Sequence, residues 1–210
     1  MEAEAIARKF RLRAPRGSAP VDLPSRLPAQ LYVVGMGGIR LPDLSGQPYA
    51  GVIMAGLAGG LDPGLVVGDV VVDSASTWRA NRVTFRRGRF HTVEGVVETV
   101  AEKAELFAKT GAAVVEMENE AVRTAAAAYS IPFLGLRAVS DSADEAIDPA
   151  VLPFIDSFGK IRINELVSEF FRHPSIVGKL RRLSRSSAIA LENLAEAVKE
   201  VIDGHTVTAG

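Results

Sequence analysis

Residues 110–118 read Thr-Gly-Ala-Ala-Val-Val-Glu-Met-Glu, residues 131–141 read Ile-Pro-Phe-Leu-Gly-Leu-Arg-Ala-Val-Ser-Asp, and these two stretches decide the fold. Each is an apolar run of strand length that ends in acidic residues. The segment between them, Asn119–Tyr129, is rich in alanine and contains neither Gly nor Pro, which predicts a helix. A strand–helix–strand unit places both sets of acids at the carboxyl ends of strands, where α/β proteins gather their ligand sites. Carboxylates held there beside Met117 suit a small polar ligand with one apolar face.

The composition narrows the class of protein. The chain of 210 residues has a formal net charge of −1 and no cysteine, which excludes disulfides and thiolate chemistry. His91, His173 and His205 lack metal-ligand spacing, so no metal is assigned and no cofactor is expected. No signal peptide is visible, which fits a cytoplasmic protein. The length predicts one domain over residues 1–210, with a C-terminal helical extension at about 160–204.

Further strands and helices alternate along the chain and predict an α/β fold, a single-domain central sheet flanked by helices. The expected strands are Leu31–Val34, Val52–Met54 and Val70–Val72. The first two run into glycine-rich turns at residues 35–38 and 56–60. The expected helices are Glu2–Phe10, Thr92–Lys109 with Gly111 as its end, Glu165–Arg172 and Ile176–Ile202.

Each acidic feature also has a simpler structural interpretation. Acids at a strand-to-helix junction stabilise the helix N-terminus by about 0.3–1 kcal/mol, and Asp141 could be a helix cap. Taken together, with acids at two successive strand ends, they favour a site. The Arg-rich residues 79–89 lack interleaved aromatic side chains, so a solvated loop is favoured over a nucleic-acid surface.

The same residues carry a resemblance to a known family. The stretch ending Glu116-Met117-Glu118, the stretch ending Ser140-Asp141 and the glycine-rich segment at 55–62 together resemble the nucleoside phosphorylase and nucleosidase superfamily. The residues Met1-Glu2-Ala3-Glu4 resemble the segment that carries that family's N-terminal catalytic glutamate. The C-terminal tail is most similar to the branch associated with hopanoid biosynthesis. The resemblance implies a phosphorylase/hydrolase-like mixed sheet and cleavage of the N-glycosidic bond of a purine (adenine-type) nucleoside or adenosylated metabolite.

The resemblance also implies roles for individual residues. Asp141 would donate a proton to the leaving purine, held by Ser140, and Glu4 would activate the attacking water. Glu118 would accept hydrogen bonds from the ribose hydroxyls, and Met117 would pack its thioether against the ribose.

Four further positions complete the predicted substrate site. Glu116 belongs to it as the second acid of its strand end, and Phe90 stands where the family often places an aromatic residue against the base. The backbone N–H groups of Ala58 and Gly59 could bind a small anion.

Water is favoured over phosphate as the nucleophile. Phosphorylases of the family usually carry an Arg on the strand before the glycine-rich turn, and Val52–Ala55 contains none. Phosphate remains the alternative co-substrate. Leu57 replaces a serine that is frequent in this turn of the nucleosidases.

The N-terminal region is shortened relative to the family pattern. Relatives have an apolar strand before the catalytic glutamate, and here Glu4 already follows Met1 closely. Either the start is set too far downstream or the protein is a reduced paralogue, and in both cases the sheet should show an exposed edge or a gap. A non-catalytic nucleoside-binding protein is therefore the second functional hypothesis.

The expected partners are a small-molecule nucleoside and further copies of the chain, as a homodimer or larger homo-oligomer. In the last helix Leu194, Val198 and Val201 recur at helical spacing, while Lys179, Arg181, Arg182 and Arg185 cluster near its start. Packing against the domain is favoured for this helix. Contact with an anionic membrane surface is the alternative.

Overall fold

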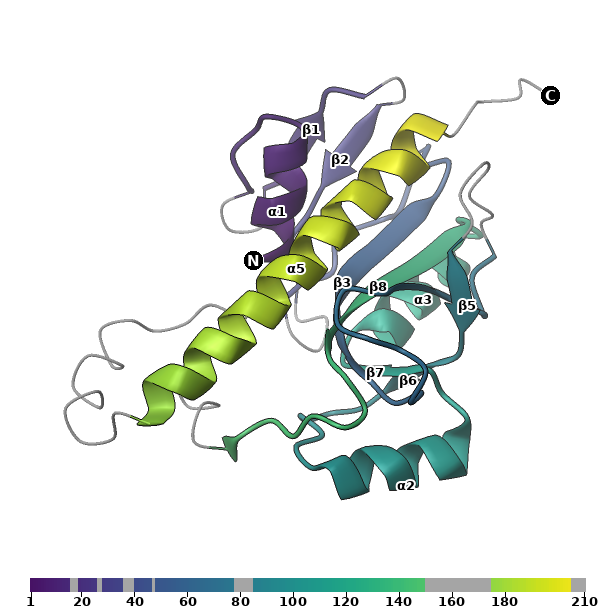
Figure 1. Ribbon diagram of the computed structural model, residues 1–210. Helices are drawn as coiled ribbons and strands as arrows, with labels where there is room; N and C mark the ends of the chain where they lie inside the picture. The colour runs from purple at the N-terminus through teal and green to yellow at the C-terminus, as the bar shows by residue number, and fades with distance from the viewer. Residues whose placement is uncertain are drawn as a thin grey trace.

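The computed structural model describes residues 1–15, 19–25, 28–35, 40–46, 48–77, 85–149 and 175–204. Six strands follow α1 in succession, and from β6 onward strands and helices alternate, as expected for an α/β protein (Figure 1). In chain order they are α1 (Glu2–Lys9), β1 (Val21–Leu23), β2 (Ala29–Leu31), β3 (Val52–Gly60), β4 (Val70–Asp73), β5 (Arg86–Gly88), β6 (Phe90–Thr92), α2 (Val100–Thr110), β7 (Val114–Glu116), α3 (Asn119–Ala128), β8 (Phe133–Asp141) and α5 (Ser175–Gly204).

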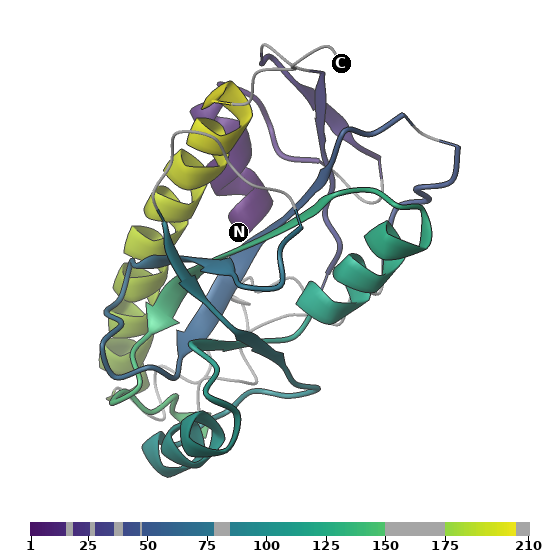
Figure 2. The same cartoon turned by 90° about the vertical axis from the view of Figure 1, so that its right-hand side faces the viewer.

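A six-stranded sheet with the order β5-β4-β8-β3-β7-β6 forms the centre of the molecule. Its two long strands, β3 and β8, are parallel, whereas β4 pairs antiparallel with β8 and β7 pairs antiparallel with β3. The predicted mixed sheet is therefore confirmed. Figure 2 shows α1 and α5 on one side of the long strands and α3 on the other. A separate two-stranded sheet, β1–β2, lies beside α1 (Figure 1).

The C-terminal helix packs onto the domain, as the favoured interpretation of its periodicity expected. Leu194, Val198 and Val201 are buried in one cluster with Ile6 of α1 and Leu136 of β8. Across the described residues, the structure contains no helix with the length and hydropathy required to cross a bilayer.

The glycine-rich segment at residues 56–60 is not a turn, contrary to the expectation from the sequence. Strand β3 continues to Gly60 and pairs with β8 as far as Gly59, which stands opposite Asp141. Glycine is needed in this strand because the Arg137 side chain lies close to the backbone of Gly56. A Cβ on Gly56 would lie 2.2 Å from Nη1 of Arg137, so a residue with a side chain would displace the arginine.

Other element boundaries also differ from the sequence predictions. The helix expected from Thr92 begins only at Val100, because Thr99 and Glu102 form a capping box there. Its predicted end is confirmed, since Gly111 has φ 62. Leu31 ends a short strand of the two-stranded sheet, and Leu31–Val34 does not join the central sheet. The predicted helix Glu165–Arg172 and most of the turn at 35–38 lie outside the described residues.

One edge of β3 is open over most of its length. On one side β3 pairs with β8 from Val52 to Gly59, whereas on the other side β7 reaches only Gly59 and Gly60. Within the described ranges, no strand pairs with Val52–Ala58 on that second side. The expected gap in the sheet is therefore present.

Candidate active site

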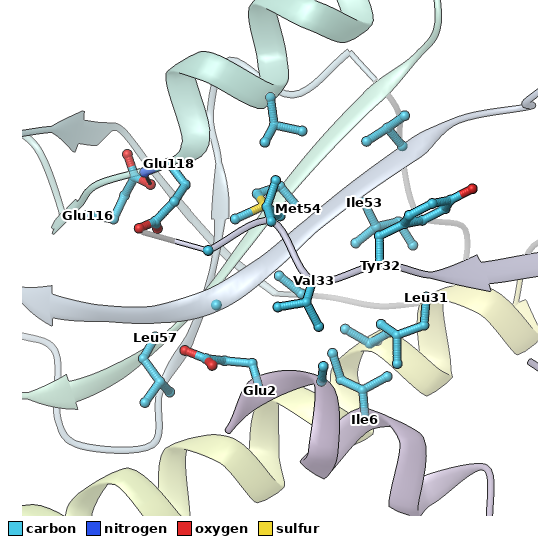
Figure 3. Close-up of a pocket in the computed structure, with 18 of the residues that line it drawn as sticks. Glu2, Ile6, Leu31, Tyr32, Val33, Ile53, Met54, Leu57, Glu116 and Glu118 are labelled. Atoms are coloured by element: carbon cyan, nitrogen blue, oxygen red, sulfur yellow. Dashed lines mark hydrogen bonds between the residues drawn. The ribbon is translucent and has the colours of Figure 1, made fainter. Parts of the chain in front are cut away.

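A cavity of about 1210 Å³ opens along the free edge of β3. Residues of β3, the carboxyl ends of β7 and β8, the start of α1 and Val198 and Ile202 of α5 line it (Figure 3). Eight of the nine residues predicted for the site are in this lining, namely Glu4, Ala58, Gly59, Glu116, Met117, Glu118, Ser140 and Asp141. The tertiary structure thus collects residues from four separate parts of the sequence.

Phe90 is the predicted residue that does not line the cavity. It lies on β6, where it pairs with Val114 of β7 and packs against the buried cluster that includes Val71 and Val139. The structure therefore does not bring Phe90 together with the other predicted site residues, and its contact with the base stays a prediction. Phe90 begins the short strand β6, which packs its partly buried ring against this cluster.

Glu116 is buried and committed to protein partners. Its carboxylate accepts hydrogen bonds from Arg137 at 2.5 Å, from the Thr92 hydroxyl, and from the backbone N–H groups of Glu118 at 2.8 Å and Asn119 at 2.6 Å. Burial raises the pKa of Glu116, but the Arg137 charge and these hydrogen bonds outweigh burial and hold the pKa below its usual value. Glu116 thus stabilises the start of α3, as its simpler structural interpretation proposed.

Arg137 is a central residue that the sequence interpretation gave no role. Its side chain is fully buried, and Nη2 lies 2.5 Å from Glu116 and 3.3 Å from Glu118. A buried guanidinium is costly to desolvate, so it requires such partners. The signal in the sequence was a single charge within the apolar run of residues 133–139.

Glu118 differs from Glu116 in its surroundings. Its side chain is 16% exposed and lines the cavity, and its ion pair with Arg137 is the longer of the two. Figure 3 shows Glu118 and Glu2 extending from opposite sides toward the same stretch of β3. Glu118 is therefore the acid of the Glu-Met-Glu stretch that is placed to meet a ligand, with Met117 half-buried beside it.

Asp141 is held from two sides. The Ser140 hydroxyl lies 2.6 Å from Oδ1, so the expected contact between these neighbours is present. Nζ of Lys103, on α2, lies 2.5 Å from Oδ2. The sequence interpretation missed Lys103, because nothing in the pattern of α2 separates this lysine from the exposed lysine at position 109.

The start of α1 supplies two carboxylates to the cavity. Glu4 is exposed and lines it, and Glu2 is partly buried and lines it as well. The sequence interpretation singled out Glu4 alone. The structure adds Glu2, whose side chain extends toward Leu57 (Figure 3).

Known proteins resemble this chain in sequence. The model of the phosphorylase superfamily matches residues 73–166. The chain is 29% identical over 213 aligned residues to futalosine hydrolase of Streptomyces coelicolor, covering 77% of this chain and 91% of that protein.

Solved structures share the fold. Futalosine hydrolase of Helicobacter pylori superposes with a TM-score of 0.59 at 16% identity, covering 96% of this chain and 93% of the other. The 5′-methylthioadenosine nucleosidase of Arabidopsis thaliana gives a TM-score of 0.62 at 17% identity, with 98% and 93% covered. The phosphorylase superfamily model thus matches the middle part of the chain, and the solved nucleosidase structures share its fold.

Proposed function

We propose that this protein hydrolyses the N-glycosidic bond of a purine nucleoside or adenosylated metabolite and releases the free base. The observation that carries the proposal is the convergence of Glu118, Asp141 and the α1 carboxylates on one cavity. The relatives named as hydrolases and nucleosidases support the same reaction class. No cofactor is needed for it.

The reaction divides among these acids. The bond from C1′ to the base nitrogen breaks, its electron pair stays on the base, and Asp141 delivers a proton to the purine ring. Glu118 accepts the ribose hydroxyls and fixes the sugar. A water molecule attacks C1′ from the opposite face, and an α1 carboxylate takes its proton, the role proposed for Glu4. Separate acids for the two proton transfers follow the logic of glycoside hydrolysis.

Phosphorolysis is the second candidate, and one observation favours it. Arg40 lines the cavity and is the only cationic side chain among its described lining residues. Arg137, which stands opposite Gly56 on β8, is not available for phosphate because it is buried against Glu116. A phosphate site would therefore depend on Arg40 and on the backbone N–H groups of β3.

The test is incubation with adenosine, methylthioadenosine, adenosylhomocysteine, inosine and futalosine, with and without phosphate, with free base and sugar products measured. Hydrolysis gives free base and free sugar at a rate that is independent of phosphate. A sugar 1-phosphate that disappears in Arg40→Gln would establish phosphorolysis instead. Binding without turnover of any of the five compounds would favour the non-catalytic alternative. Glu2→Gln and Glu4→Gln, assayed side by side, identify the α1 carboxylate that activates water.

The proposed function carries two further expectations from the family resemblance. The protein should form a homodimer or larger homo-oligomer, and it should act in the cytoplasm. Sedimentation equilibrium and cell fractionation test them.

A further inference from the structure

Lys103 is a buried cation whose contacts the proposed chemistry leaves unexplained. Its side chain is fully buried on α2, and its ammonium has three acceptors. These are Oδ2 of Asp141 at 2.5 Å and the backbone carbonyl oxygens of Ser142 and Glu145, each at 2.8 Å. A lysine is almost never fully buried unless it is paired in this way.

The ammonium lies behind Asp141 and outside the cavity. Lys103 is absent from the described residues that line the cavity, whereas Asp141 is among them. Its position is fixed by its helix, because the Thr99–Glu102 capping box holds the start of α2 and Gly111 ends it. Lys103 therefore contacts Asp141 from a helix that is capped at both ends, and it does not line the cavity itself.

The contacts define the orientation of the Asp141 carboxyl group. Oδ2 is held by Lys103 and Oδ1 by the Ser140 hydroxyl, so rotation of the carboxyl group would break at least one hydrogen bond. The bonds to the carbonyl groups of Ser142 and Glu145 also fix the turn that follows β8. A proton donor must be aligned with the acceptor atom, and small misplacements are costly in rate.

We propose that Lys103 is a positioning residue for catalysis, which orients Asp141 toward the leaving base without touching the substrate. This inference rests on the proposed function, because it assigns Asp141 the role of proton donor. It predicts a loss in kcat with little change in KM, since the groups that bind the sugar remain in place. Loss of an aligned donor should cost about 10²-fold in kcat.

Two variants separate the contributions of Lys103. Lys103→Met removes the charge and all three hydrogen bonds, whereas Lys103→Gln removes the charge and retains a shorter side chain with two N–H donors. Lys109→Met is the matched control, because Lys109 is an exposed lysine on the same helix. Thermal unfolding establishes which variants are folded, and Lys103→Gln carries the test if Lys103→Met is not.

The decisive measurement is a double-mutant cycle with Asp141→Asn. If Lys103 acts through Asp141, adding Lys103→Gln to Asp141→Asn lowers kcat no further than Asp141→Asn alone. If the two losses multiply, Lys103 has only a structural role and the inference is overturned. A rise in KM as large as the fall in kcat would also overturn the inference.

The same cycle on the Kd of free adenine gives a readout that does not require turnover. One outcome is that the wild-type protein releases no base while the effects of the Lys103 and Asp141 variants on adenine binding are coupled. That result would reject the proposed hydrolysis and retain the contact by which Lys103 positions Asp141. If the wild-type protein is active and the two variants change adenine binding independently of each other, the positioning role is rejected and the proposed hydrolysis stands.

Discussion

The two sides of the cavity are held together very differently. On one side, the acid end (residues 116–118 and 140–141) is fixed by the buried pairs Arg137–Glu116 and Lys103–Asp141. On the other, the α1 side (residues 1–10) packs Ile6 and Phe10 against α5 in the core, and its ion pairs, from Lys9 to Glu192 and Glu196, lie at the surface. It faces the open edge of β3. Exposed pairs are screened by water and contribute little, whereas a buried pair is expensive to break. The binding half of the site is therefore held by buried ion pairs, whereas the half that supplies the nucleophile relies on apolar packing and on exposed pairs.

The largest expected effect is on catalysis at the acid end. Asp141→Asn keeps the shape of the side chain and removes the transferable proton, so base release should fall by about 10²–10⁴-fold. Nucleoside binding should persist. Release at the wild-type rate would remove Asp141 from the mechanism.

The next largest effect is expected on the free energy of unfolding, measured for one variant at the acid end and one on the α1 side. Arg137→Met leaves Glu116 buried without its cation and should lower the free energy of unfolding by about 3–5 kcal/mol. Lys9→Met removes surface pairs only and should leave the denaturation midpoint close to that of the wild type. Urea titration of both variants measures the contrast. Equal losses would show that the α1 side is as firmly held as the acid end.

A smaller effect is expected on ligand affinity. Glu118→Ala removes charge-assisted hydrogen bonds to the ribose and should weaken nucleoside binding by about 1.5–3 kcal/mol. Affinity for free adenine should not change, and calorimetry with both ligands measures the difference. An equal loss for nucleoside and base would assign Glu118 a structural role.

The open edge of β3 can be used to strengthen the α1 side. Seven residues that alternate valine and threonine, fused before Met1, can pair with Val52–Ala58 and should raise the free energy of unfolding by about 1–2 kcal/mol through added backbone hydrogen bonds. A Gly/Ser extension of equal length is the control. The same gain from both extensions would exclude pairing with β3.

The smallest effect is the pH dependence of the buried pair. Because the pKa of Glu116 lies below its usual 4.5 in the folded protein, the pair stabilises the fold above that pH. Its contribution is lost as the pH falls through the lowered pKa. Glu116→Gln should therefore lose less stability than the wild type on acidification from pH 5 to pH 3, as measured by urea titration. Parallel curves would contradict the ion-pair assignment.

Local patterns predicted the elements that depend on neighbouring residues. The helix at 119–128, the strand ends at 116 and 141 and the αL end of α2 at Gly111 all follow from spacing and turn chemistry. The glycines of β3 were misinterpreted as a turn. Glycine usually interrupts a strand, and here it makes room for Arg137 from the adjacent strand.

The sequence by itself determined that acids would stand at the carboxyl ends of two strands beside an apolar wall. Only the tertiary structure decided which acids are paired with buried protein groups and which can meet a ligand. Arg137 reaches Glu116 across 21 residues of sequence, and Lys103 reaches Asp141 across 38. Such contacts depend on strand register and helix packing, which local periodicity does not encode. The same register directs Phe90 into the core and leaves Glu118 facing the cavity.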